Sequence, residues 1–299
     1  MALTINTNLS SLIAQRNLAS ATNALNTSIE RMTTGYKINH AGDNAAGYSI
    51  ASLWKTHISS LDVASDNAAA GADLLTTAEE TYGLILDHFQ RIRDLTEQAG
   101  NGTYGSNSLK AVKAEMVARL DEINRITAGA EYNGIKLMDG SIGASGIKLQ
   151  VGLYGDANSQ ITLAQSLFKK ADTITLFTDT SLGNITSVTT NDEIAVKLSG
   201  YVAGACKTDQ ATYLTGIDKI VADLSDRVTG IGSSQNRVDS ALTSIEVQSR
   251  NLVSSLSTLR DTDVAEESSN YIQAQILQQA SATLLSTANQ APSIALNLI

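Results

Sequence analysis

The chain has 299 residues and a formal net charge of −9, and it is 42% hydrophobic but only 4% aromatic, with one proline and one cysteine. The acidic balance argues against a nucleic-acid binder, which needs clustered Lys and Arg, and no stretch approaches the roughly 18 apolar residues that span a bilayer. Cys206 alone cannot form an internal disulfide, and the absence of proline before Pro292 allows long helices almost throughout.

The amino-terminal segment predicts an amphipathic helix that needs a partner. Its apolar residues recur at intervals of three, four and their sums, among Asn, Ser, Thr, Gln and Ala. An isolated helix with so narrow an apolar stripe is marginal in water. The stripe comprises Ile5, Leu9, Leu12, Leu18, Leu25, Ile29 and Met32.

A loop-like stretch over 34–44 precedes two longer helical segments. Apolar residues return at approximately heptad spacing over 75–99 and again line one face over 109–126. Between these segments, the Gly and Asn content of NGTYGSNS, residues 101–108, predicts a turn. The pattern indicates an antiparallel helical hairpin.

The middle of the chain has a different pattern. Over 131–168, glycines interrupt short apolar runs, which predicts short hairpin strands. Residues 171–209 are rich in Thr and Ser with β-branched neighbours, which predicts a loop or small β insertion. Helical periodicity then returns from about residue 211 and continues past Thr262 to Pro292.

The two amphipathic ends of the chain are natural partners, because each has an apolar stripe to cover. We therefore expect a mainly α fold, a long antiparallel helical bundle formed by the paired N- and C-terminal regions, with a small β-hairpin region and a short central insertion. The expected domains are an inner coiled-coil domain of 1–43 with 259–299, a helical domain with β-hairpins of 44–170 with 210–258, and a surface insertion of 171–209.

Both ends also carry long ordered motifs. These are LTINTNLSSLIAQRNL and TSIERMTTGYKINHAGDNAAGYSIA at the start, and AQILQQA and ANQAP at the close. FQRIRDLTEQAGNGT, YNGIKLMDG and SSQNRVDSALTSI lie between them. Together the motifs resemble those of bacterial flagellin, the subunit of the flagellar filament, over roughly both outer thirds of the chain.

The resemblance implies a structural subunit, not an enzyme, that polymerises into an extracellular helical filament used for swimming. The residues 1–11, MALTINTNLSS, lack the pattern of a secretory signal, and the resemblance implies type III secretion in its place. The implied partners are further copies of the chain in heterologous helical contacts, an export chaperone, and the flagellar cap and junction proteins. A hook–filament junction protein and a coiled-coil scaffold stay open as alternatives.

We expect the subunit interface in the inner domain. Each terminal segment has little charge and few large apolar side chains to bury. We therefore expect it to be disordered before assembly and to fold as it joins its neighbours. Buried amides and charges there would fix the register of contacts, or would simply be solvated. With the amino-terminal stripe, the expected interface includes Gln15, Arg16, Tyr271, Ile276, Leu277, Leu284 and Leu285.

The resemblance also implies a possible contact with a toll-like receptor of animal hosts. The matching positions are Gln90, Arg91, Leu95 and Glu115. The alternative is a helix face that is buried between subunits in the filament.

Possible glycosylation sites are of two kinds. Asn101 and Asn184 lie in N-x-S/T sequons, and Thr173, Thr178 and Ser187 could carry O-linked sugars as in some flagellins. Ordinary turn chemistry explains such residues otherwise.

No pattern indicates catalysis, a cofactor or a metal. His40, His57 and His88 have no Cys or His nearby at metal-ligand spacing. The chain also lacks a glycine-rich phosphate loop ending in Gly-Lys-Ser/Thr. Adjacent carboxylates such as Glu79 and Glu80 point apart on a helix, so they indicate solvated faces.

Overall fold

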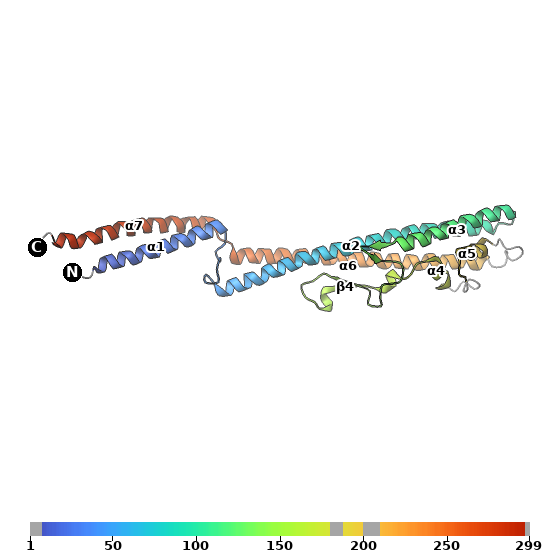
Figure 1. Ribbon diagram of the computed structural model, residues 1–299, viewed down its shortest axis with the longest axis horizontal. Coiled ribbons are helices and arrows are strands. Elements are labelled where there is room, and N and C mark those ends of the chain that lie inside the picture. Colours follow the sequence, from blue (N-terminus) through green and yellow to red (C-terminus); the bar gives the residue numbers. More distant parts are fainter. Residues whose placement is uncertain (1–7, 180–187, 200–209, 297–299) are drawn as a thin grey trace. The chain divides into compact units, whose positions relative to one another are not determined.

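The computed structural model describes residues 8–179, 188–199 and 210–296 (Figure 1). These residues are mainly helical, which confirms the predicted fold class. The α-helices are α1 (Leu9–Thr34), α2 (Ala45–Ala99), α3 (Ser106–Gly129), α4 (Thr173–Asp179), α5 (Asn191–Ser199), α6 (Gln210–Arg260) and α7 (Val264–Leu296).

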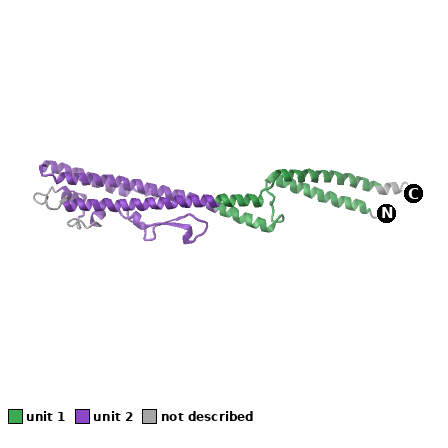
Figure 2. Ribbon diagram, turned by 180° about the vertical axis from the view of Figure 1, so that it is seen from behind, with its two compact units in different colours: residues 1–59, 249–299 green, residues 60–248 purple. Residues whose placement is uncertain are grey.

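The chain divides into two compact units, which are coloured separately in Figure 2. The first comprises Met1–Ser59 with Ser249–Ile299, and the second comprises Ser60–Gln248. Helices α2 and α6 contribute residues to both units. The domain boundaries expected near residues 43 and 259 coincide instead with the breaks between α1 and α2 and between α6 and α7.

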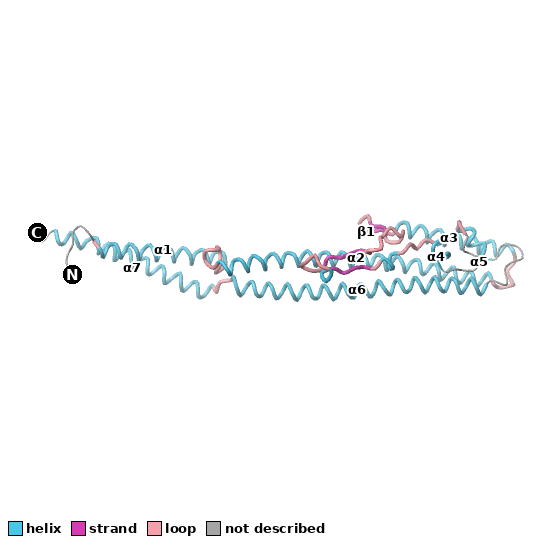
Figure 3. Tube along the Cα trace, turned by 90° about the horizontal axis from the view of Figure 1, so that it is seen from below, coloured by secondary structure: helices cyan, strands magenta, loops and turns pink. Residues whose placement is uncertain are grey.

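The core of the second unit lies among α2, α3 and α6, which run alongside one another in Figures 1 and 3. Ion pairs link α2 to each neighbour, from Arg91 Nε to Glu115 Oε1 of α3 at 2.9 Å and from Arg93 Nε to Asp218 Oδ1 of α6 at 2.6 Å. The predicted periodic positions are indeed buried. The fully buried side chains include Leu75, Tyr82, Ile85, Phe89 and Ile92 of α2, Met116, Leu120 and Ile123 of α3, and Ile217, Ile220, Leu224 and Ile231 of α6.

Two separate antiparallel hairpins follow α3, as the glycine-punctuated pattern predicts. Strand β1 (Glu131–Tyr132) pairs with β2 (Ile135–Lys136), and β3 (Ile147–Gln150) pairs with β4 (Gln160–Leu163). Short 3-10 turns, η1 (Ala157–Ser159) and η2 (Gln165–Phe168), flank β4. The tight β1–β2 turn needs positive φ at both central residues, and Asn133 and Gly134 supply it at 48° and 80°.

The predicted loop or β insertion over 171–209 is wrong at residues 173–179 and 191–199, which form two short helices, whereas the described residues 171–172 and 188–190 are not helical. Phe177 of α4 is fully buried with its ring centroid 6.0 Å from that of Phe89. Ile194 and Leu198 of α5 are also fully buried. Burial of these side chains outweighs the strand preference of the β-branched residues within α4 and α5. Cys206 lies outside the described residues.

A buried polar cluster fastens the segment around η2 to α2 and α6. The Tyr82 hydroxyl donates to the Leu167 carbonyl at 2.9 Å, and Arg227 Nη1 donates to the Lys169 carbonyl at 3.2 Å. Arg227 also pairs with Asp223 through Nη2 at 2.7 Å. Burial raises the pKa of Tyr82, so the hydroxyl stays a hydrogen-bond donor.

Candidate subunit interface

Helices α1 and α7 form an antiparallel pair within the first unit, as predicted for the two ends of the chain (Figure 1). The Asn8 side chain caps α1 by accepting from the Ser11 N–H at 3.1 Å, and its amide donates to the Ala288 carbonyl at 2.7 Å. Helix α1 ends at Gly35, whose φ of 74° suits glycine and whose N–H donates to the Arg31 carbonyl.

Small side chains make the contact between these two helices. We call the buried contact residues the seam. At every seventh residue along each helix a side chain is buried, which keeps one face toward the partner. The seam consists of Ser11, Ala14, Ala21 and Ser28 of α1 and of Glu267, Ala274 and Ser281 of α7.

The prediction that the large apolar residues of α1 form one stripe is wrong. Leu18 and Leu25 are half-buried beside the seam, whereas Leu9 and Leu12 are 67% and 63% exposed. The reason is that the spacing between Leu12 and Leu18 is not a whole number of helical turns, so the two groups lie on different faces.

The exposed apolar side chains lie on both helices. Beside Leu9 and Leu12, sequence reasoning missed Ile13 and Ile272, each 53% exposed. Gln15 and Arg16 are exposed, Tyr271 and Leu285 are half-buried, and Ile5 lies outside the described residues. The other expected interface residues, all exposed, are Ile29, Met32, Ile276, Leu277 and Leu284.

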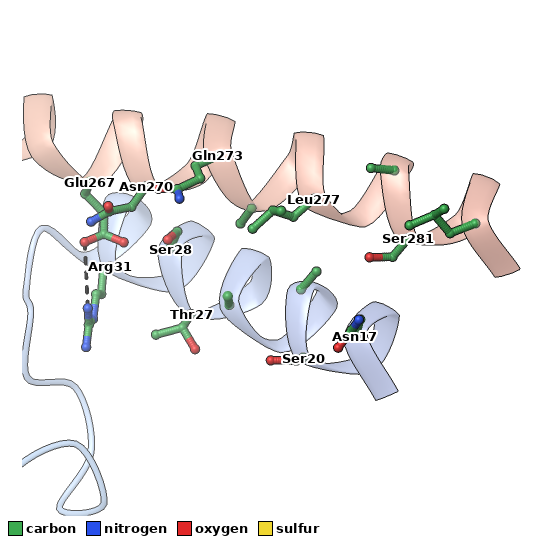
Figure 4. A pocket seen from close by; sticks show the side chains of 15 residues that line it. Asn17, Ser20, Thr27, Ser28, Arg31, Glu267, Asn270, Gln273, Leu277 and Ser281 are labelled. Carbon is green, nitrogen blue, oxygen red and sulfur yellow. Dashed lines mark ion pairs between the residues drawn. The ribbon is translucent and has the colours of Figure 1, made fainter. Parts of the chain in front are cut away.

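A groove of about 700 Å³ runs along one side of the seam (Figure 4). Small side chains such as Ala24 and Ala280 line it, together with the larger Leu277 and Leu284 of α7. Figure 4 shows the ion pair between Arg31 and Glu267 at one end of the groove. Next to the groove, Ile272 and Ile276 continue the apolar surface of α7.

The two connections that follow α1 and precede α7 are fastened together. The Lys37 N–H donates to the Arg260 carbonyl at 2.7 Å, and the Thr262 N–H donates to the Gly35 carbonyl at 2.9 Å. The Arg260 guanidinium lies 4.1 Å from the centroid of the Tyr36 ring. These contacts hold the end of α1 next to the start of α7.

Asp43 organises the loop before α2. Its Oδ2 accepts hydrogen bonds from the backbone N–H groups of His40, at 2.9 Å, and Asn39, at 3.0 Å. These bonds stabilise the carboxylate and lower the pKa of Asp43.

Comparison with known proteins identifies the family of this chain. The family model for the bacterial flagellin N-terminal helical region matches residues 5–142, and that for the C-terminal helical region matches residues 214–299. Polar flagellin F of Vibrio parahaemolyticus is 30% identical over 100% of both chains. The chain belongs to the bacterial flagellin family. Flagellin of Bacillus subtilis is 31% identical over 99% of each chain. A crystal structure of Bacillus cereus flagellin gives a TM-score of 0.45 at 26% identity, covering 60% of this chain and 88% of that one.

This flagellin is a structural subunit that polymerises into the extracellular filament of the bacterial flagellum, which serves motility. Full-length flagellin relatives favour the filament subunit over a junction protein or a scaffold. Within the described residues, no helix has an apolar stretch that could cross a membrane. The described side chains include no group of three or more His, Cys, Asp or Glu that could hold a metal ion.

The four residues matched to receptor recognition do not share one surface. In this flagellin, Gln90 and Arg91 are exposed, and Arg91 pairs with Glu115 of the neighbouring helix. Leu95 is only 1% exposed because it lies on the face of α2 that packs into the core of the second unit. Leu95 is therefore corrected from a possible surface contact to a core residue.

The possible glycosylation sites also separate. Asn101 is exposed in the turn between α2 and α3, where its Oδ1 accepts from the Thr103 N–H at 3.2 Å. Thr173 is fully buried and its hydroxyl contacts Asn124, so the expectation of a sugar there is wrong. Thr178 is half-buried and its hydroxyl donates to the Ile174 carbonyl. The predicted positions Asn184 and Ser187 lie outside the described residues.

Proposed function

We propose that the α1–α7 pair is the polymerisation module of this flagellin. The supporting observation is that small residues make most of the seam while large apolar residues are exposed, the reverse of the usual burial of large apolar side chains. Burying a large aliphatic side chain contributes about 1.5–3 kcal/mol. Neighbouring subunits would gain this contribution at residues such as Leu9, Leu12, Ile276 and Leu284, which are 59–67% exposed.

The exposed surfaces on the two helices differ, which favours heterologous contacts. On α7, Leu277 and Leu284 adjoin a groove with small side chains, whereas Leu9, Leu12 and Ile13 form a compact apolar group near the start of α1. A patch that meets a different patch on the next copy generates an open helix when the rotation does not close. A filament follows from such contacts.

We also propose that the pair becomes ordered only as subunits join. Apart from Glu267, the seam buries Ala and Ser side chains, which contribute little apolar area, and a helical pair with so little buried apolar surface is marginal in water. Ends that are unfolded before assembly suit passage through a narrow export channel. Type III secretion, an export chaperone, and the cap and junction proteins belong to this proposal.

Substitution of the apolar group on α1 tests the module. We expect Leu9→Ser with Leu12→Ser to raise the critical concentration for polymerisation about 100-fold, because two buried leucines are lost at about 1.5 kcal/mol or more each. Sedimentation of filaments at graded protein concentrations measures this. Ala19→Ser, at an exposed position of the same helix, is the matched control and should leave the value unchanged. An unchanged critical concentration in the double variant rejects the module.

Circular dichroism tests the ordering step and separates it from a preformed scaffold. We expect the helix signal of the isolated flagellin to rise when filament fragments are added as seeds, because α1 and α7 then gain partners. The control is the same chain incubated without seeds. A signal that is already maximal before seeding contradicts coupled folding and assembly.

Two surface roles are proposed for residues that are exposed or half-buried. A toll-like receptor would meet Gln90, Arg91 and Glu115, since Arg91 and Glu115 form a surface ion pair between α2 and α3. A sugar on the described residues would be carried by Asn101, whose turn is exposed, before the half-buried Thr178.

A further inference from the structure

We propose that Arg31 and Glu267, together with two hydrogen-bonded pairs farther along the helices, set the register of α1 against α7 in the filament. This inference rests on the proposed polymerisation module. These polar residues select one alignment of the two helices, whereas the seam alone would allow several.

The seam by itself selects an alignment poorly. Apart from Ser11 and Glu267, its residues repeat every seven positions and are nearly alike in size, with Ala14, Ala21 and Ser28 on α1 and Ala274 and Ser281 on α7. A slide of seven residues would place one small side chain where another had been. The larger Leu18 and Leu25, half-buried beside the seam, are also seven residues apart, so the same slide would exchange one leucine for the other.

Three polar contacts mark the observed alignment along the whole pair. Arg31 Nη1 lies 3.8 Å from Glu267 Oε2 at one end. Gln278 Nε2 donates to Thr22 Oγ1 at 3.2 Å in the middle, and the Ser11 hydroxyl donates to Asn289 Oδ1 at 2.7 Å near the other end. The α7 members recur every eleven residues, which is about three helical turns, so all three face α1.

Glu267 makes a wrong alignment costly. Its side chain is only 6% exposed, and the other cation of α1, Arg16, lies too far along the helix to replace Arg31 as its partner after a slide of seven residues. A slide of seven residues would place Glu267 opposite Ala24 in one direction and beyond the end of α1 in the other. A carboxylate that stays buried after losing its cation is strongly unfavourable, whereas exchanging small seam residues costs little.

The neighbouring Glu266 provides an internal comparison. Both glutamates lie in the first turns of α7, where negative charge favours the helix N-terminus. The Glu266 side chain is exposed and lies outside the seam, and its backbone N–H donates to Asp263 Oδ1. A general effect of helix-end charge would therefore appear at both positions, whereas register selection predicts an effect at Glu267 alone.

Disulfide trapping in filaments tests the proposal. In a Cys206→Ser background, Thr22→Cys is combined with Gln278→Cys to report the observed alignment, or with Tyr271→Cys or Leu285→Cys to report a slide of seven residues. Filaments are oxidised, dissolved in denaturant without reductant, and separated on gels that resolve the intrachain disulfide. Each reporter is combined with Glu267→Gln, with Glu266→Gln as the matched control, and with the charge exchange Arg31→Glu/Glu267→Arg.

We expect Glu267→Gln to raise the yield of the 22–271 or 22–285 disulfide, which reports the slide, at least tenfold relative to the parent. Glu266→Gln should leave these yields unchanged. The charge exchange should restore the 22–278 disulfide as the main product. If Glu267→Gln forms no filaments, recovery of filaments with the 22–278 disulfide in the charge exchange supports the proposal. A Glu267→Gln filament with only the 22–278 disulfide overturns it, as does a charge exchange that restores neither filaments nor alignment. The polymerisation module fails separately, if the Leu9 and Leu12 variant assembles normally.

Discussion

We expect removal of Ser281–Ile299 to abolish polymerisation of this flagellin and to leave the second compact unit folded. The deletion removes the seam residue Ser281, the exposed Leu284, and the contacts that Ala288 and Asn289 make with the start of α1. Helix α1 then loses its partner over the stretch that holds Leu9 and Leu12. The deleted segment belongs to the first unit, whereas the core among α2, α3 and α6 lies in the second unit, Ser60–Gln248.

Electron microscopy and sedimentation of the truncated chain, seeded with intact filament fragments, measure the loss of assembly. Cooperative thermal unfolding followed by circular dichroism is the control for the second unit, and its midpoint should match that of the intact monomer. Filaments of normal length from the truncated chain contradict the prediction. Loss of the cooperative transition would mean that the second unit needs the deleted segment for its own stability.

Phe89→Ala lowers the free energy of unfolding of the second unit by about 3–5 kcal/mol, the usual cost of deleting a buried phenylalanine. Phe89 is fully buried on α2 and contacts Phe177 of α4, so the substitution leaves a cavity and also removes the packing partner of the central insertion. Equilibrium unfolding in denaturant, followed by helix content, measures the change.

Leu84→Ala is the matched control for this substitution. Leu84 lies on the same helix but is 54% exposed, so we expect a change within about 0.5 kcal/mol, as is usual for surface substitutions. Equal losses in the two variants would mean that the core of the unit lies elsewhere. A loss below 1 kcal/mol for Phe89→Ala would contradict the burial that the structure assigns to it.

The candidate interface was predictable in part. The terminal motifs and the need of each end for a partner pointed to α1 and α7, and exposed residues such as Ile276 and Leu284 were among those predicted. Ile13 and Ile272 were missed because they fall between the positions that a single stripe selects. Leu95 and Thr173 were assigned surface roles from motif resemblance, although both are buried. Leu95 lies on the core face of α2, and the Thr173 hydroxyl donates to Asn124 Oδ1.

The sequence by itself determined the helices, their pairing at the two ends and the hairpins, because helical periodicity, glycine punctuation and the scarcity of proline are local properties of the chain. Only the tertiary structure decided which face of α1 meets α7, that residues 173–179 and 191–199 are helical, and that Arg227 reaches the Lys169 carbonyl. Those outcomes depend on which surfaces compete for burial. On α1 the large side chains of Leu9 and Leu12 lie away from the contact with α7, so hydrophobicity alone points to the wrong face.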